Sequence, residues 1–396
     1  MSASEKTKSE PARRVQFAFT DEQEQFRSAL RRFLNDKSPT TEVRRLMATA
    51  EGYNPDVWRQ LSEELALPGI QIPEQYGGAG FGMVELCIVT EEQGRALLCA
   101  PYFSTTVLAA NGILNGGTEA QKASLLPELA SGARLATLAV TEPDGNWDPH
   151  SIELAATPAA DGYLLEGTKS YVVDGHVADL LIVAARVGAK GGDNGLALFT
   201  LGANSSGVER RVLESMDPTR KIARIDFHRA HAELLGNPDN GAKAIFRTLD
   251  QAAIALANEM AGGAQAMLDS AVDYAKLRVQ FGRTIGSFQA IKHRCADMLL
   301  DVELAKSAAY YAAQASAIDD PEWPALASLA KAAASETYLR TAAECIQIHG
   351  GIGFTWDNDT HLWFKRAKSS EVFLGQPHYH RELLMQRWGV CDGESE

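Results

Sequence analysis

Three long amphipathic segments in the C-terminal part of the chain constrain the fold more than any other feature. Apolar residues recur at helical spacing through 243–279, 286–317 and 324–349. A fourth segment with helical character lies near 359–388. Helices of this kind bury one face against each other, and four in succession are typical of a four-helix bundle. We therefore expect residues 237–396 to form a C-terminal helical bundle.

The rest of the chain divides into two further regions with different sequence patterns. Between 136 and 236, short runs rich in Val, Ile, Leu and Tyr alternate with clusters of Gly, Asp and Asn, which predicts strands joined by tight turns. Residues 20–135 show helical spacing again. The sequence thus predicts an α+β multi-domain protein. Its parts are an N-terminal all-α domain at 20–135, a middle antiparallel β-barrel or sandwich at 136–236, and a four-helix bundle, preceded by a disordered lead-in at 1–19.

Charge and cysteine usage limit the partners. The net charge is −13, and no long run of Lys or Arg is present. This argues against nucleic acid or an anionic membrane as the main partner. The five cysteines are dispersed without CxxC spacing, which argues against a disulfide framework or a metal site and favours a reducing compartment. The N-terminus lacks the apolar core of a signal peptide, so we expect a cytoplasmic protein.

Four motifs carry the chemistry. They are PEQYGGAGFG at 73–82, LAVTEPDGNWD at 138–148, RVQFGRTIGSFQAIKHRCADM at 278–298, and QIHGGIGFTWDNDTHLWFKRAKSSEVFLG at 347–375. In this order and spacing they resemble the acyl-CoA dehydrogenases, flavoenzymes that desaturate acyl thioesters. The resemblance covers nearly the whole chain after residue 20. It implies FAD as cofactor, an acyl-CoA substrate and an electron-transferring flavoprotein as electron acceptor.

The resemblance places Thr141 and Tyr171 beside the flavin ring. Thr141 begins a turn with hydroxyl and backbone donors, although ordinary strand-end chemistry would explain the same residue. Tyr171 lies in a predicted strand, where relatives carry an aromatic near the ring. Two positions depart from the family pattern. Trp147 replaces a serine that often contacts substrate, and Val173 lacks a hydroxyl that often faces the flavin.

Three further residues are implied at the dinucleotide end of FAD: Arg278, Phe281 and Gln289. An arginine is planar, permanently charged and suited to a pyrophosphate. Gln289 follows Arg278 by three helical turns, so that the two can lie on one side of a helix hairpin. The structural alternative is a surface arginine in a charged helix.

Gln347, Gly350 and Gly351 complete the implied cofactor site. Successive glycines let backbone amides approach a phosphate or adenosine closely, but a glycine cluster after a helix is also an ordinary helix end. In the family this loop reaches the FAD of the neighbouring subunit. The resemblance therefore implies a homo- or hetero-oligomer, a dimer or tetramer, with a related subunit.

The catalytic base is the main departure. A carboxylate must take the α-proton of the thioester. The family usually carries it just before the final glycine or, in some members, early in the first bundle helix; here these positions are Leu374 and about Ala252. Glu259 lies seven residues after Ala252 in a small, apolar stretch, where burial would raise the pKa of a carboxyl group. We take Glu259 as the candidate base; the alternative is a buried structural hydrogen bond, for instance to Arg278 or to a neighbouring subunit.

Glu371 also lies near Leu374, and we expect it to form a salt bridge with Lys368 or Arg366. The helix around Glu259 and the ending FLGQPHYHRELL resemble bacterial members that act on steroid side-chain or dicarboxylic acyl-CoAs, many of which are heteromers. Three hypotheses follow. The first is a dehydrogenase subunit, and the second is a catalytically silent partner that completes the FAD site of a homologous active chain. A relative that oxidises nitroalkanes or hydroxylates with reduced flavin ranks last.

Overall fold

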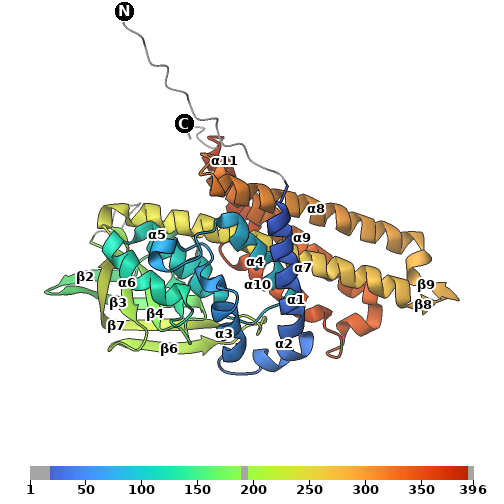
Figure 1. The fold of residues 1–396 in the computed structure, drawn as a ribbon, viewed down its shortest axis with the longest axis horizontal. Coiled ribbons are helices and arrows are strands. Elements are labelled where there is room, and N and C mark those ends of the chain that lie inside the picture. The colour runs from blue at the N-terminus through green and yellow to red at the C-terminus, as the bar shows by residue number, and fades with distance from the viewer. Residues whose placement is uncertain (1–17, 189–194, 391–396) are drawn as a thin grey trace, which may run out of the picture.

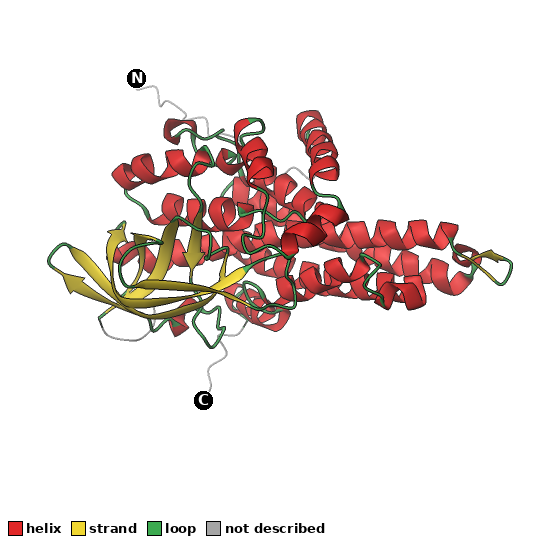
Figure 2. Cartoon of the chain, turned by 90° about the horizontal axis from the view of Figure 1, so that it is seen from below, coloured by secondary structure: helices red, strands yellow, loops and turns green. Residues whose placement is uncertain are grey.

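The computed structural model describes residues 18–188 and 195–390 (Figure 1). The predicted lead-in lies outside these residues, except for its last two positions. A β-barrel forms one end of the molecule, and long helices extend from it to the other end (Figure 2). Within the described ranges, no helix combines the length and apolar character that crossing a bilayer requires.

The N-terminal part is helical, as predicted. Thr20 caps its first helix, because the Thr20 hydroxyl accepts from the Gln23 amide while the Gln23 side chain accepts from the Thr20 amide. A π-helical turn at Phe103–Ala109 precedes the fifth α-helix. The helices are α1 (Asp21–Lys37), α2 (Thr40–Met47), α3 (Pro55–Glu63), α4 (Met83–Ala96), α5 (Ala110–Gly116) and α6 (Glu119–Ala130).

The middle part is a closed seven-stranded sheet. Its strands are β1 (Ala136–Ala139), β2 (Ala155–Ala159), β3 (Gly162–Val173), β4 (Leu180–Val187), β5 (Leu196–Gly202), β6 (Val208–Leu213) and β7 (Ile222–Leu235). The sheet closes because β4 pairs with β2 on one side and with β5 on the other. Most pairings are antiparallel, as predicted, but β1 and β2 each run parallel to β4. Long connections allow such parallel neighbours. Phe199 and Phe227 fill the barrel interior.

The C-terminal part contains the predicted long helices as α7 (Gly241–Leu277), α8 (Gln289–Ala317) and α9 (Trp323–His349). A small hairpin of β8 (Val279–Gln280) and β9 (Arg283–Thr284) joins α7 to α8 at the end of the molecule opposite the barrel (Figure 2). Helix α4 packs closely on α7, since a Cβ at Gly262 would lie 1.9 Å from the Glu91 carbonyl oxygen.

The prediction of one helix near 359–388 is wrong. The structure has two helices there, α10 (Thr360–Val372) and α11 (Pro377–Arg387). Between them the backbone takes φ values of 61° at Leu374 and 102° at Gly375. Positive φ is incompatible with a right-handed helix, and Pro377 provides no amide to continue the ladder of α10.

Candidate active site

A cavity of about 420 Å³ lies between the barrel and the helices, and we call it the barrel–bundle cavity. Its walls come from β3, from the connection between β6 and β7, and from α10. The residues that line it include Trp147, Tyr171, Val173, Arg220, Val372 and Phe373. A largely apolar cavity with a few polar groups is the usual form of a small-molecule site.

Tyr171 is brought into this cavity, as the prediction requires. The register of β3 against β7 shifts between Lys169 and Val172, and Tyr171 takes a φ of 58° at this irregularity. Its side chain remains 41% exposed while it lines the cavity. A bulge that turns one side chain out of a sheet is a common feature beside functional sites.

Thr141 is placed less favourably for a ligand. It is buried, and its hydroxyl donates to the Ser170 carbonyl oxygen at 2.6 Å, so that its proton is already used inside the protein. The Ser170 amide in turn donates to the Thr141 carbonyl oxygen at 2.9 Å. Thr141 therefore fixes the strand next to Tyr171, and its hydroxyl is left only as an acceptor.

Lys169, which the sequence reasoning missed, holds the turn that follows Thr141. Its ammonium group is fully buried and donates to the Val140 carbonyl oxygen at 2.6 Å and to Glu142 Oε1 at 3.0 Å. Burial lowers the pKa of Lys169 to about 8, although Glu142 opposes this shift. The Glu142 carboxylate also accepts from the amides of Glu153 and Leu154. Lys169 stands between Thr168 and Ser170 in β3, and this polar run gave no local signal of its burial.

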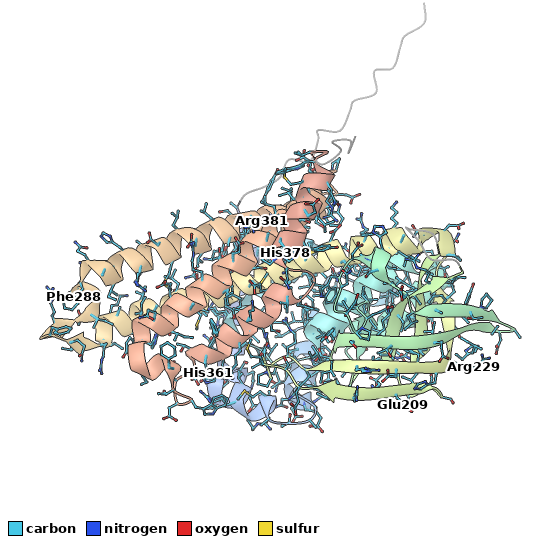
Figure 3. All side chains as sticks on the ribbon, turned by 180° about the vertical axis from the view of Figure 1, so that it is seen from behind. Glu209, Arg229, Phe288, His361, His378 and Arg381 are labelled. Atoms are coloured by element: carbon cyan, nitrogen blue, oxygen red, sulfur yellow. The ribbon has the colours of Figure 1, made fainter. Side chains whose placement is uncertain are left out.

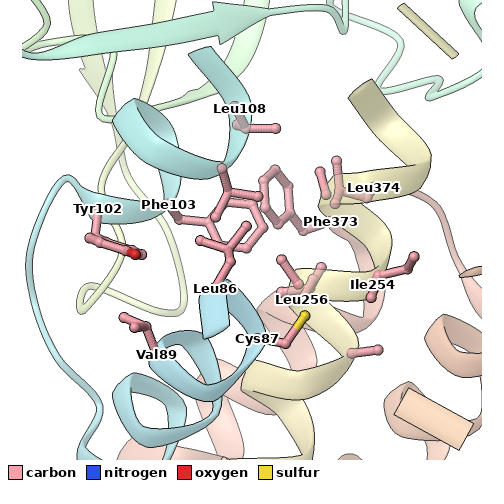
Figure 4. Close-up of a cluster of buried hydrophobic side chains, with 14 of the residues drawn as sticks. Leu86, Cys87, Val89, Tyr102, Phe103, Leu108, Ile254, Leu256, Phe373 and Leu374 are labelled. Carbon is pink, nitrogen blue, oxygen red and sulfur yellow. The ribbon is translucent and has the colours of Figure 1, made fainter. Parts of the chain in front are cut away.

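Aromatic rings form one wall of the cavity. The Phe373 ring lies 5.2 Å from the Trp147 ring and 5.5 Å from the Phe103 ring, centroid to centroid, both in edge-to-face geometry. Figure 4 shows Phe103 and Phe373 side by side, with Leu374 next to Phe373. Such pairs gain attraction beyond their buried area. Trp147 is therefore part of a packed wall.

The surroundings of Glu259 differ from the prediction. Its carboxylate is not unpaired, because Arg220 Nη2 donates to Glu259 Oε1 and Oε2 at 2.5 and 2.6 Å, and Arg366 Nη1 donates to Oε1 at 3.1 Å. Arg278, the partner suggested by the sequence, is not involved. Glu259 borders a small pocket of about 20 Å³ that also touches Val173 and Arg220. It does not line the larger cavity.

Arg366 links Glu259 to the connection between β6 and β7. Arg366 Nε donates to Asp217 Oδ2 at 2.8 Å, and its Nη2 donates to the Thr219 hydroxyl at 2.7 Å. All three side chains are buried. Glu371 pairs with Lys368, which is one of the two partners expected from the sequence.

Leu374 is only 4% exposed and belongs to the apolar core (Figure 4). Two buried groups that the sequence reasoning missed hold its turn. Lys331 Nζ donates to the carbonyl oxygens of Gly375 at 2.9 Å and Glu371 at 3.2 Å, and His380 Nε2 lies 2.8 Å from the Leu374 carbonyl oxygen. Burial lowers the pKa of Lys331 to about 7 and that of His380 to about 3.

The residues predicted for the dinucleotide lie elsewhere. Arg278 and Gln289 are exposed at the ends of α7 and α8, and the Phe281 side chain is 91% exposed on the hairpin between them. Figure 3 shows Phe288 at this end of the molecule, with Glu209 and Arg229 on the strands at the other. At about 1.5 Å per helical residue, Glu259 and Arg278 are about 28 Å apart along α7.

Gln347, Gly350 and Gly351 lie at the same far end. The His349 ring stacks on the Tyr274 ring at 4.2 Å, which brings the end of α9 beside the end of α7. No atom of residues 18–188 or 195–390, apart from their own chain neighbours, lies within 4 Å of the Cβ positions of Gly350 and Gly351, so their backbone is open to a ligand or a second chain. One chain therefore does not bring the two predicted groups of cofactor residues together.

Comparison with known proteins covers the same three parts of the chain. The N-terminal domain of acyl-CoA dehydrogenase matches residues 20–133, the middle domain matches 137–229, and the C-terminal domain matches 239–389. This chain belongs to the acyl-CoA dehydrogenase family. The predicted family and the predicted order of helical, β and helical domains are confirmed.

Individual acyl-CoA dehydrogenases extend the comparison. The acyl-CoA dehydrogenase IpdE2 of Mycobacterium tuberculosis is 37% identical over 342 residues, covering 86% of this chain and 88% of that protein. The Tcur3481-Tcur3483 steroid ACAD is 30% identical with a TM-score of 0.84, covering 93% of this chain and 98% of that one. The ChsE4-ChsE5 complex of M. tuberculosis is 25% identical with a TM-score of 0.86, covering 94% and 99%.

FAD is the expected cofactor of an acyl-CoA dehydrogenase, and the residues present fit it. Tyr171 offers an aromatic face within an apolar cavity, which suits a flat ring. Arg278 offers an exposed guanidinium, and Gly350 and Gly351 offer uncovered backbone, which suit phosphates. The two sets would hold opposite ends of the dinucleotide.

Proposed function

We propose that this protein is an FAD-dependent acyl-CoA dehydrogenase that desaturates an acyl-CoA thioester between its α- and β-carbons, as one subunit of a hetero-oligomer. The observation that carries the proposal is the barrel–bundle cavity, with Tyr171 and Phe373 in its walls, in a chain that matches all three family domains in order. The family resemblance supports an electron-transferring flavoprotein as electron acceptor and a cytoplasmic location.

The cavity residues would position the reactants. When bound, FAD supplies the acceptor for the hydride that leaves the β-carbon. Tyr171 would contact its ring from β3, next to Val173, which contributes only apolar contact. Phe373 and Trp147 would exclude water from the acyl group, and a dry site strengthens the hydrogen bonds that polarise a thioester carbonyl.

A second chain is supported by the separation of the cofactor residues. Tyr171 lies at the barrel, whereas Arg278 and Gly350 lie at the far end of the bundle. This far end also exposes large apolar side chains: Leu277 is 79%, Phe281 91% and Phe354 76% exposed. Exposed apolar surface of this extent marks an interaction site. A related subunit bound there would place its own flavin-ring residues next to Arg278 and Gly350 of this chain, and the two chains would together hold one FAD.

The base is the reason for proposing an unlike partner. Leu374 is a buried hydrocarbon, and both oxygens of Glu259 already accept from Arg220. Arg366 holds the same carboxylate, and Glu259 does not line the barrel–bundle cavity where the acyl group would lie. We therefore infer that Glu259 serves mainly to hold Arg220 and Arg366, and that the partner's active site supplies a carboxylate of its own.

The second hypothesis is a catalytically silent partner subunit. It differs from the first only in whether the cavity beside Tyr171 of this chain binds a flavin ring. The test is to purify this chain with the related subunit that co-purifies with it and to count FAD per complex. If this chain itself binds a flavin ring, Tyr171→Ala should lower the FAD content of the complex. A silent subunit predicts that Tyr171→Ala leaves it unchanged, while Arg278→Gln lowers it in either case.

A separate experiment tests whether Glu259 is the catalytic base. Anaerobic bleaching of the flavin by acyl-CoA should survive Glu259→Gln in a complex that retains its FAD if the partner supplies the base. Loss of bleaching without loss of FAD or of acyl-CoA binding would identify Glu259 as the base instead.

A further inference from the structure

Arg220 carries a buried hydrogen-bond donor that the protein does not use. The residue lies in the connection between β6 and β7 and is 9% exposed. Its Nη2 donates to both carboxylate oxygens of Glu259. Its Nη1 is buried and, across the residues described, has no hydrogen-bond partner. An unpaired buried donor costs free energy, so a group of this kind in a folded protein calls for a partner.

The guanidinium is held in one orientation. Its central carbon lies 5.4 Å from the centroids of both the Phe103 and the Phe373 ring. Glu259 fixes one edge of the planar group, and the two aromatic rings limit its rotation. Arg220 nevertheless lines the barrel–bundle cavity as well as the small pocket next to Glu259. A donor held in this way in a side chain that lines a ligand cavity offers an acceptor a fixed direction.

The charges around Arg220 indicate what kind of acceptor fits. Arg220 and Arg366 face two carboxylates, Glu259 and Asp217. The two positive and two negative charges of this group therefore cancel. Asp174 also borders the small pocket. The cavity wall adds one negatively charged residue, Glu214, and one positively charged residue, Lys368. No positive charge is in excess, and a ligand carboxylate would therefore enter as an uncompensated buried charge. A neutral oxygen needs no such compensation.

We propose that Arg220 Nη1 donates to a neutral oxygen, a ketone or hydroxyl, on the acyl group of the substrate, away from the thioester. Arg220 then selects oxygenated acyl-CoAs over plain hydrocarbon ones and over acyl-CoAs with a second carboxylate. The proposal rests on the proposed function, because the acyl-CoA is the ligand. A flavin carbonyl oxygen shares the same acceptor chemistry, and the test separates the two.

The test measures dissociation constants by titration calorimetry on the FAD-loaded complex with its partner subunit. The ligands share one skeleton: cyclohexylpropanoyl-CoA, its isomeric ring ketones and its ring carboxylic acids. We expect at least one ring ketone to bind about tenfold more tightly than the parent, a typical gain for a hydrogen bond to a charged group. The ring carboxylic acids should bind no more tightly than the parent.

Two variants assign the gain to Arg220. Arg220→Met should remove the ketone preference and leave binding of the parent within about twofold, since the parent has no oxygen on its ring to accept from Nη1. Arg224→Met, on β7 and paired with Asp226, is the matched control and should keep the preference. Because Arg220→Met leaves Glu259 without its main partner, the comparison is repeated between Glu259→Gln and the double variant R220M/E259Q.

The outcomes separate cleanly. Equal binding of the whole series by the wild-type complex would overturn this proposal and leave the proposed function standing. A ketone preference that survives Arg220→Met, with a shifted flavin absorbance spectrum, would also overturn it and place Nη1 on the flavin. Failure of every thioester to bind would overturn the proposed function together with this inference.

Discussion

The ring nitrogen Nε2 of His380 lies 2.8 Å from the carbonyl oxygen of Leu374. This contact holds a bulky residue at a φ of 61°, a conformation that costs free energy unless the surroundings impose it. Lys331 holds the next carbonyl, that of Gly375, at 2.9 Å. The turn between α10 and α11 is thus kept in place around a buried hydrocarbon side chain that cannot act as a base.

His380 should make the protein acid-sensitive. Its pKa falls from 6.5 to about 3 on folding, mainly because burial disfavours the charged ring. The unfolded chain then binds more protons, so the stabilisation is present above pH 6.5 and is lost as the pH falls toward 3. We expect His380→Gln to flatten this part of the curve of melting temperature against pH. The exposed neighbour His378→Gln is the control, and an unchanged curve for His380→Gln would contradict the assignment.

Lys331 should contribute at the alkaline side. Its pKa falls from 10.5 to about 7 because burial disfavours the ammonium, partly offset by Glu371. The unfolded chain again binds more protons between these values, so stability rises with pH from about 7 to 10.5. Lys331→Met should remove this rise and lower the unfolding free energy near pH 7 by about 1–3 kcal/mol, because it leaves buried carbonyls unpaired. Lys276→Met, on the exposed end of α7, should do neither.

Glu259 should behave as a structural ion-pair partner in the isolated chain. Removing one member of a buried ion pair costs about 3–5 kcal/mol, because the remaining charges lose their compensation. Glu259→Gln should therefore lower the melting temperature clearly, measured by calorimetry. Glu336→Gln breaks an exposed pair with Arg381 and should cost about 0–1 kcal/mol. Equal melting temperatures for the two variants would show that the Arg220 and Arg366 contacts contribute little.

The apolar end of the bundle should be an interface. Replacing a large aromatic anchor costs about 2 kcal/mol, which raises a dissociation constant about thirtyfold. Phe281→Ser with Phe354→Ser should therefore shift the complex toward single subunits in light scattering at limiting concentration. Val212→Ser removes a 46% exposed apolar residue from β6 and should leave the mass unchanged. An intact complex in the double variant would place the interface elsewhere.

Local patterns predicted the helices and strands well, because helical spacing extends through α7, α8 and α9 without interruption. The break between α10 and α11 was missed, since a leucine at positive φ gives no local signal of its own. The partners of Glu259 were missed for a different reason. Arg220 and Arg366 are 39 and 107 residues away in the chain, so that only the tertiary fold brings them to the carboxylate. Spacing along one helix could place Glu259 on a face but could not identify what it meets there.

If the proposal is right, this chain needs a second, related subunit for a complete flavin site. FAD content and anaerobic bleaching by acyl-CoA should be compared for the chain alone and for the complex that it forms. We expect little bound FAD and no bleaching for the chain alone, with both restored in the complex. Stoichiometric FAD and full bleaching in the chain purified alone would contradict it.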